Sequence, residues 1–128
     1  MTTEMQAMLL LLTLLQVKHL FADYFLQTQR MLRDKARYVH VGRAQHAGLH
    51  AAMSLVAFLL VGAAPAVAAV ICLAEGVAHF HIDWLKGRHG ARSGQGPDQA
   101  GYWRAFGVDQ LMHQLTYVAM LWAWLVWG

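Results

Sequence analysis

The chain has 128 residues, of which 58% are hydrophobic and only 13% are charged, and its formal net charge is +3. This number of charged residues is too small to cover the exterior of a soluble domain of this size. The composition therefore favours a protein embedded in a bilayer over the alternative, a soluble helical bundle. Nearly all basic residues lie in two polar segments between apolar stretches, which is typical of membrane topology and argues against a nucleic-acid partner.

Four apolar segments are long enough to cross roughly 30 Å of hydrocarbon at about 1.5 Å per residue. We expect membrane helices over residues 5–27, 46–63, 66–85 and 108–127, within a single domain that covers residues 1–128. Gly62 and Pro65 indicate a tight turn between the second and third helices, which makes these two antiparallel neighbours. The predicted fold is all-α: an up-and-down bundle of four transmembrane helices with both termini on the same side.

The two polar connections, residues 29–45 and 87–107, hold nearly every lysine and arginine. In an up-and-down bundle of four helices these connections share a side, and basic loops stay on the cytoplasmic side of a membrane. We therefore expect an integral protein of the inner membrane, with both basic loops in the cytoplasm and both termini outside.

Each of the four predicted helices carries a pair of metal-ligand residue types at positions i and i+4, which lie on one helix face about one turn apart. Because the helices alternate in direction, all four pairs fall within roughly 12 Å of the cytoplasmic helix ends at 1.5 Å per residue. Each pair alone has a plainer explanation, such as an intrahelical hydrogen bond between His79 and Asp83, but four pairs at one depth together indicate a single site. The eight candidate ligands are His19, Asp23, His46, His50, His79, Asp83, Asp109 and His113.

Ionisable groups inside a membrane span are costly, about 2.5–3.5 kcal/mol for an aspartate at mid-membrane. A divalent cation is the natural compensation for a bundle that keeps three aspartates and five histidines on inward faces. Imidazole and carboxylate ligands suit Zn²⁺, our first choice, with Mn and Fe as alternatives. A tetrahedral ion takes about four protein ligands, so the eight residues predict a site for one ion or two.

Other polar residues border this predicted layer. Gln27, Gln110 and Lys86 are candidates for orienting the ligands or binding a substrate anion. Glu75 lies deeper, at about the depth of Lys18, where a buried ion pair is the plain interpretation and a catalytic proton acceptor is the alternative.

The ligand pairs belong to longer motifs, which run from His19 to Gln27, His46 to His50, His79 to Lys86 and Asp109 to His113. In this order, and over essentially the whole chain, they resemble a family of small bacterial and phage membrane proteins, domain of unknown function 3307. The resemblance implies a membrane protein with four helices and supplies no activity. More loosely, the His-x-x-x-Asp spacing is similar to that of inner-membrane proteins labelled metal-dependent hydrolases.

The leading hypothesis is a metal-dependent hydrolase of a lipid or another amphiphilic (phospho)ester. A metal ion lowers the pKa of its bound water toward neutrality and polarises a phosphoryl or acyl oxygen, while Asp109 or Glu75 serves as general base. The alternatives are a non-catalytic scaffold stabilised by metal, a small carrier of metal ions or protons, and a di-iron oxidative enzyme. The expected partners are membrane lipids and the amphiphilic substrate, and a homo-oligomer is left open.

Overall fold

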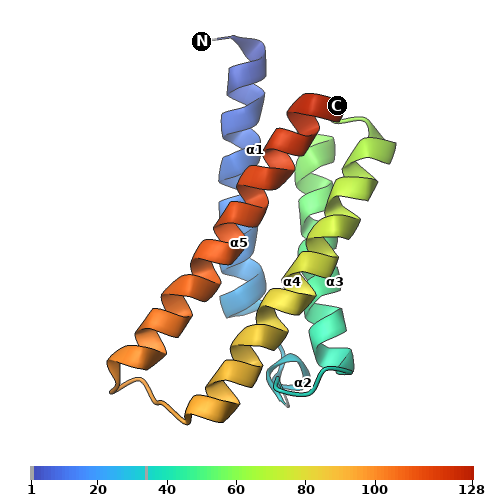
Figure 1. Ribbon diagram of the computed structural model, residues 1–128. Helices are drawn as coiled ribbons and strands as arrows, with labels where there is room; N and C mark the ends of the chain where they lie inside the picture. Colours follow the sequence, from blue (N-terminus) through green and yellow to red (C-terminus); the bar gives the residue numbers. More distant parts are fainter. Residues whose placement is uncertain (1, 34) are drawn as a thin grey trace.

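The computed structural model describes residues 2–33 and 35–128, and all regular structure within these ranges is helical. Four long helices, α1 (Thr3–Leu20), α3 (Val41–Leu60), α4 (Pro65–Ser93) and α5 (Ala100–Trp127), run up and down the molecule (Figure 1). A π-helical turn, η1 (Phe21–Phe25), continues α1, and a short helix, α2 (Gln29–Leu32), lies in the first polar connection. The all-α prediction is confirmed for the described residues, with one short helix more than expected.

Neighbouring helices pack as a ring in which α1 and α4 each contact both α3 and α5. Gly62 adopts a positive φ of 85°, and Pro65 starts α4, so the chain reverses direction between α3 and α4 within a few residues. These two helices are the predicted antiparallel neighbours. In Figure 1 the start of α1, the α3–α4 turn and the end of α5 lie at one end of the molecule, and α2 and the α4–α5 connection lie at the other.

The helix boundaries at the two basic connections differ from the prediction. α3 begins at Val41 rather than at residue 46, because the side chain of His40 caps it and accepts a hydrogen bond from Arg43 N at 3.0 Å. α4 continues to Ser93 and ends where Gly94 takes a left-handed φ of 61°. Since α5 already begins at Ala100, the expected loop over residues 87–107 was wrong: only residues 94–99 separate two helices that extend well past the candidate ligands.

The interior of the molecule has an apolar half and a polar half. The apolar cluster near the termini includes Leu11, Leu15, Phe58, Ile71 and Met120. Toward the basic connections, polar and ionisable side chains are buried instead. They are Lys18, His19, Arg43, His46, His50, Ser54, Glu75, His79, Asp109 and His113.

The exterior, by contrast, carries many large apolar side chains. Leu60 is 68% exposed, Leu73 is 71% exposed and Trp122 is 64% exposed. Two helical segments in the described part of the chain, Thr3–Phe25 and Pro65–Ser93, are long and apolar enough to cross a membrane, against the four that the sequence predicted.

Candidate metal centre

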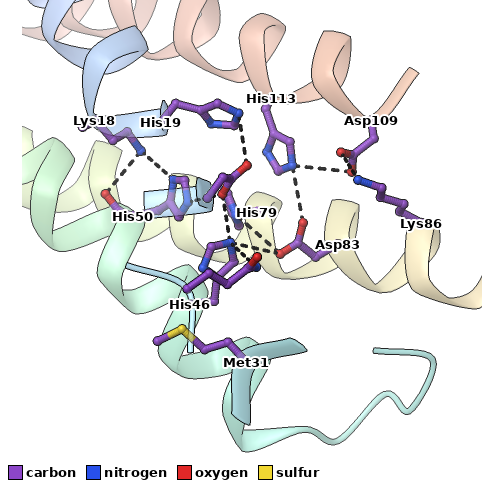
Figure 2. Close-up of polar contacts among 12 residues, drawn as sticks. Lys18, His19, Met31, His46, His50, His79, Asp83, Lys86, Asp109 and His113 are labelled. Atoms are coloured by element: carbon purple, nitrogen blue, oxygen red, sulfur yellow. Dashed lines mark hydrogen bonds and ion pairs between the residues drawn. The ribbon is translucent and has the colours of Figure 1, made fainter. Parts of the chain in front are cut away.

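All eight candidate ligands lie in the polar half of the interior, where contacts between side chains link them into one network (Figure 2). Asp23 is the first of two central carboxylates. Its Oδ1 lies 2.9 Å from His50 Nε2 and 3.1 Å from His46 Nε2, and its Oδ2 lies 3.2 Å from His19 Nε2. Asp23 therefore joins the end of the first long helical segment to α3.

Asp23 occupies the π-helical turn that follows α1. The wider turn is closed by a hydrogen bond from Leu26 N to Phe21 O at 2.9 Å. A π turn fits an extra residue into one turn and so changes the direction of the side chains that follow, and such turns recur at functional sites. The sequence suggested a regular helix through residue 27, so this local distortion was missed.

Asp83 on α4 is the second central carboxylate. Its Oδ1 lies 3.4 Å from His113 Nε2, and its Oδ2 lies 3.5 Å from His79 Nε2 and 3.7 Å from His46 Nε2. These separations exceed the usual length of a hydrogen bond, about 2.7–3.2 Å. They match the spacing of ligands around a shared ion, because two atoms each about 2.1 Å from Zn²⁺ at a tetrahedral angle are about 3.4 Å apart.

The potential ligand atoms fall into two groups, within each of which all the atoms lie within 4.8 Å of one another. The four-ligand group consists of Asp23, His46, His50 and His79, and the three-ligand group consists of His79, Asp83 and His113. These largely buried groups could hold a metal ion. His79 belongs to both groups, and its Nε2 is a buried atom that has no hydrogen-bond partner in the described part of the chain, as a coordinating nitrogen would before its ion binds.

His19 and Asp109 belong to neither of these groups, although both adjoin them. His19 Nδ1 lies 2.8 Å from the Tyr117 hydroxyl, and its Nε2 lies 3.2 Å from Gln110 Oε1. Asp109 accepts a hydrogen bond from Lys86 Nζ at 2.8 Å, and its other oxygen lies 3.6 Å from His113 Nε2. The structure therefore places six of the eight candidates in the two ligand groups and two beside them.

The flanking polar residues also contact the network. Gln27 Nε2 lies 3.5 Å from His46 Nε2, and Gln110 Nε2 donates to Asp109 Oδ2 at 3.2 Å. His81, by contrast, is exposed on the other face of α4, where it lies 3.1 Å from the Tyr38 hydroxyl.

Lys18 and Glu75 form the expected buried ion pair, with Lys18 Nζ 2.5 Å from Glu75 Oε1. Lys18 Nζ also lies 3.0 Å from His50 Nδ1 and donates to the His50 carbonyl at 3.4 Å. The Lys18 ammonium can only donate, so His50 Nδ1 accepts and the neutral ring carries its proton on Nε2, which lies 2.9 Å from Asp23 Oδ1. Sequence reasoning missed this link, and it also missed Tyr117, whose position four residues after His113 on the same helix face was an available signal.

Residues of the polar network line two cavities. The larger, of about 520 Å³, lies between α4 and α5 and is lined by Lys86 and Asp109 among others. The smaller, of about 160 Å³, is lined by Asp83 together with Lys35 and Lys86. Lys35 comes from the first basic connection, and nothing in its sequence context indicated that it would reach this site.

A family model described as "Protein of unknown function (DUF3307)" matches residues 10–127, a range that contains every candidate ligand. No curated protein and no solved structure matches the chain. The motif resemblance to that family is confirmed, whereas no similarity to hydrolases is found. The protein therefore belongs to the DUF3307 family, whose description assigns no activity.

Proposed function

We propose that the protein is an integral membrane enzyme that uses a divalent metal ion to hydrolyse a phosphoester of a lipid or another amphiphile. The observation that carries the proposal is that the three-ligand group reaches a cavity, because its carboxylate, Asp83, forms part of the wall. Catalytic zinc sites keep three protein ligands and one open position, whereas structural sites are closed by four. Zn²⁺ is our first choice, with Mn and Fe as alternatives.

The charges around the cavities suit an anionic substrate. Lys35 and Lys86 line the smaller cavity beside Asp83, and Arg104 and Lys86 line the larger one. Lysine and arginine side chains stabilise the charge that develops on a phosphoryl group during its transfer. A phosphoester therefore suits this site better than a neutral carboxylic ester.

Of the two candidate bases, Asp109 has the better position. It lines the larger cavity, and its Oδ1 is buried with no hydrogen-bond partner in the described part of the chain. Glu75 Oε2 is also buried without a hydrogen-bond partner in the described part of the chain, but Glu75 is paired with Lys18 and lines neither cavity. We therefore assign the base to Asp109 and give Glu75 a positioning role through Lys18 and His50.

A divalent ion held by His79, Asp83 and His113 would supply Lewis acidity and would make a water more nucleophilic near neutral pH. Asp109 accepts a proton from the attacking water, the new oxygen–phosphorus bond forms, and the ester oxygen–phosphorus bond breaks. The leaving alkoxide takes this proton back from Asp109 and departs as the alcohol, and the phosphate product keeps the oxygen of the water. Lys86, 2.8 Å from Asp109 Oδ2, holds this carboxylate and offers its ammonium group to the phosphoryl oxygens.

The membrane location is supported by the contrast between the two surfaces of the helices. Outward faces carry exposed residues such as Leu60, Val70 and Leu73, whereas the inward faces carry the polar layer. A soluble protein rarely exposes so many large apolar side chains while it buries ionisable ones. We propose that the four long helices form a transmembrane bundle in the inner membrane, with the basic connections and the metal centre on the cytoplasmic side and the termini outside.

The four-ligand group favours a second role for metal. Asp23, His46, His50 and His79 come from three chain segments, η1, α3 and α4, and four ligands complete a closed tetrahedral site. An ion there would stabilise the bundle as a scaffold. Because His79 is shared, one ion would occupy either group, and two ions would require both nitrogens of its ring.

The proposal is tested with protein purified in detergent, loaded separately with Zn²⁺, Mn²⁺ and Fe²⁺, and supplied with a panel of lipid and soluble phosphoesters. We expect turnover with at least one ion, and a fall of about 10²- to 10⁴-fold in Asp109→Asn with metal content unchanged. Asp98→Asn, an exposed aspartate in the α4–α5 connection, is the matched control and should keep full activity. Bound metal without turnover of any phosphoester would reject the hydrolase and leave the scaffold, and oxygen consumption with a visible absorption band would indicate di-iron chemistry instead.

A further inference from the structure

We infer that the larger cavity, the cleft between α4 and α5, binds a membrane lipid that ends in a phosphate group. The inference rests on the proposed function and names its substrate class. With a volume of about 520 Å³, the cleft falls within the range of small-molecule sites, roughly 300–1,000 Å³.

The cleft is polarised along its length. On the side toward the centre of the bundle its walls include the apolar Ile82, Leu85, Val108 and Met112, with Asp109 among them. On the side toward the α4–α5 connection they include His89 and Arg104. From Ile82 to His89 the rise is about 10 Å along α4 at 1.5 Å per residue, so a ligand that fills the cleft needs an apolar end and a charged end.

The charged end of the cleft suits an anion. The cations Lys35, Lys86 and Arg104 line the two cavities, against the two carboxylates Asp83 and Asp109, which leaves 3 − 2 = +1 before any metal ion is counted. A divalent ion in the three-ligand group would raise this local charge further. A terminal phosphate is anionic and accepts charge-assisted hydrogen bonds from several such donors at once.

The cleft and the metal centre share their walls. Lys86, His89, Gln95 and Ala105 line both cavities, and the smaller cavity extends to Asp83 of the three-ligand group. A phosphate held between Lys86 and Arg104 would therefore lie beside the open position where we place the reaction.

The orientation of the cleft indicates the bilayer as the source of the ligand. Leu85, Val108 and Met112, which line its apolar end, are themselves exposed on the outside of the helices. Tyr102 lines the smaller cavity at the charged end, and its neighbour in the chain, Trp103, is 56% exposed. Exposed tyrosine and tryptophan side chains are typical of the level of lipid headgroups. A lipid in the leaflet would present its chain and its phosphate in the same order.

Binding is measured with chelator-treated, metal-free protein, so that hydrolysis does not enter. The protein is reconstituted in phosphatidylcholine nanodiscs and titrated with dodecyl phosphate, dodecanol or inorganic phosphate. Of the three compounds, we expect only dodecyl phosphate to bind saturably. Arg104→Gln should weaken this binding about tenfold, as for the loss of one charge-assisted hydrogen bond. Arg104→Lys should keep most of the wild-type affinity. Ala105→Trp fills the cleft and should abolish binding. Arg88→Gln, which alters an exposed arginine of α4 that stacks on Trp84 and lines neither cavity, should leave binding unchanged.

Equal binding of dodecanol would overturn the role of the phosphate, and equal binding of inorganic phosphate would overturn the role of the chain. Equal effects of Arg104→Gln and Arg88→Gln would overturn the assignment of the cleft. If metal-free protein binds dodecyl phosphate and metal-loaded protein hydrolyses no phosphoester, the lipid-binding cleft is supported and the proposed hydrolase activity is rejected. If metal-loaded protein hydrolyses soluble phosphoesters and metal-free protein binds no dodecyl phosphate, the hydrolase activity is supported and the lipid-binding cleft is rejected.

Discussion

His113 Nε2 on α5 lies 3.4 Å from Asp83 Oδ1 on α4, a separation that suits two ligands of one tetrahedral zinc ion better than a hydrogen bond. The contact joins the two helices that form the proposed lipid cleft. An ion bound there would fasten α4 to α5 at the depth where the cleft meets the polar layer. Metal binding, helix packing and substrate binding are therefore expected to depend on the same residues.

Metal should stabilise the fold. A ligand that binds only the native state at 100 times its Kd contributes about 2.7 kcal/mol, so excess Zn²⁺ should raise the unfolding temperature of chelated protein in detergent. Asp83→Asn should lose most of this increase, because it replaces the carboxylate that contacts three histidines. An equal increase in Asp83→Asn and wild type would place the stabilising ion elsewhere, with Asp23→Asn as the variant that tests the four-ligand group.

The Lys18–Glu75 pair should show strong coupling between its two members. Lys18→Met leaves the carboxylate of Glu75 buried without its partner, and removing one member of a buried pair costs about 3–5 kcal/mol. The double variant Lys18→Met/Glu75→Leu should cost much less than the sum of the two single variants, as measured by the free energy of unfolding in detergent titrations. Additive costs would mean that the pair does not act as a unit.

The same single variant should strengthen metal binding at the four-ligand group, because the Lys18 ammonium donates to His50 Nδ1 and so keeps the ring proton on the Nε2 that would bind the ion. Loss of this donor and of its positive charge should raise the metal affinity about tenfold, as for one charge-assisted hydrogen bond. Competition with a chromogenic chelator measures this affinity. An unchanged or lower affinity in a folded Lys18→Met protein would remove His50 from the metal-binding set or Lys18 from the control of its ring proton.

Alanine substitutions at two glycines of α4 should change the free energy of unfolding in opposite directions. A Cβ at Gly87 would lie 2.5 Å from the carbonyl oxygen of Lys35, so Gly87→Ala should push the first basic connection off α4 and cost about 1–3 kcal/mol. Gly90 has open space around it, so Gly90→Ala should add about 0.5–1 kcal/mol of helix stability. Comparable unfolding free energies for the two variants would contradict this packing of the basic connection.

The proposed orientation is testable with single cysteines in spheroplasts. Ala64→Cys in the α3–α4 turn should react with a membrane-impermeant maleimide added outside, and Ser93→Cys at the end of α4 should react only after permeabilisation. The native Cys72 is buried and should not contribute. The reverse pattern would invert the topology and place the metal centre outside.

The buried polar layer could be predicted from the sequence because the spacing of its residues along each helix is a local pattern. Residues at i and i+4 share a helix face, so pairs such as His79 and Asp83 could be placed without knowing how the helices pack. Helix direction then brought the pairs to one depth. The division into a four-ligand and a three-ligand group could not be predicted, since it depends on how each helix is rotated about its axis and on the π turn at Asp23.

The helix ends were harder to predict than the helices. Glycines, Pro97 and basic residues made residues 87–107 look like a loop, but only Gly94 takes a left-handed conformation there, and α4 and α5 continue on either side. Because these residues were expected to form a loop, the cleft between α4 and α5 could not be predicted: its walls are the ends of these two helices. The role of Lys35 was equally hidden, because it depends on a close approach of the first connection to Gly87.

The most direct test of the metal centre compares His79→Ala with His81→Ala by elemental analysis of protein purified in detergent. His79 belongs to both ligand groups, whereas His81, two residues along the same helix, is exposed and lies near Tyr38. We predict one or two equivalents of a divalent metal ion in wild type and in His81→Ala, and a loss of most of that metal in a folded His79→Ala. Wild-type protein without stoichiometric metal, or equal metal content in the two variants, would contradict the metal centre.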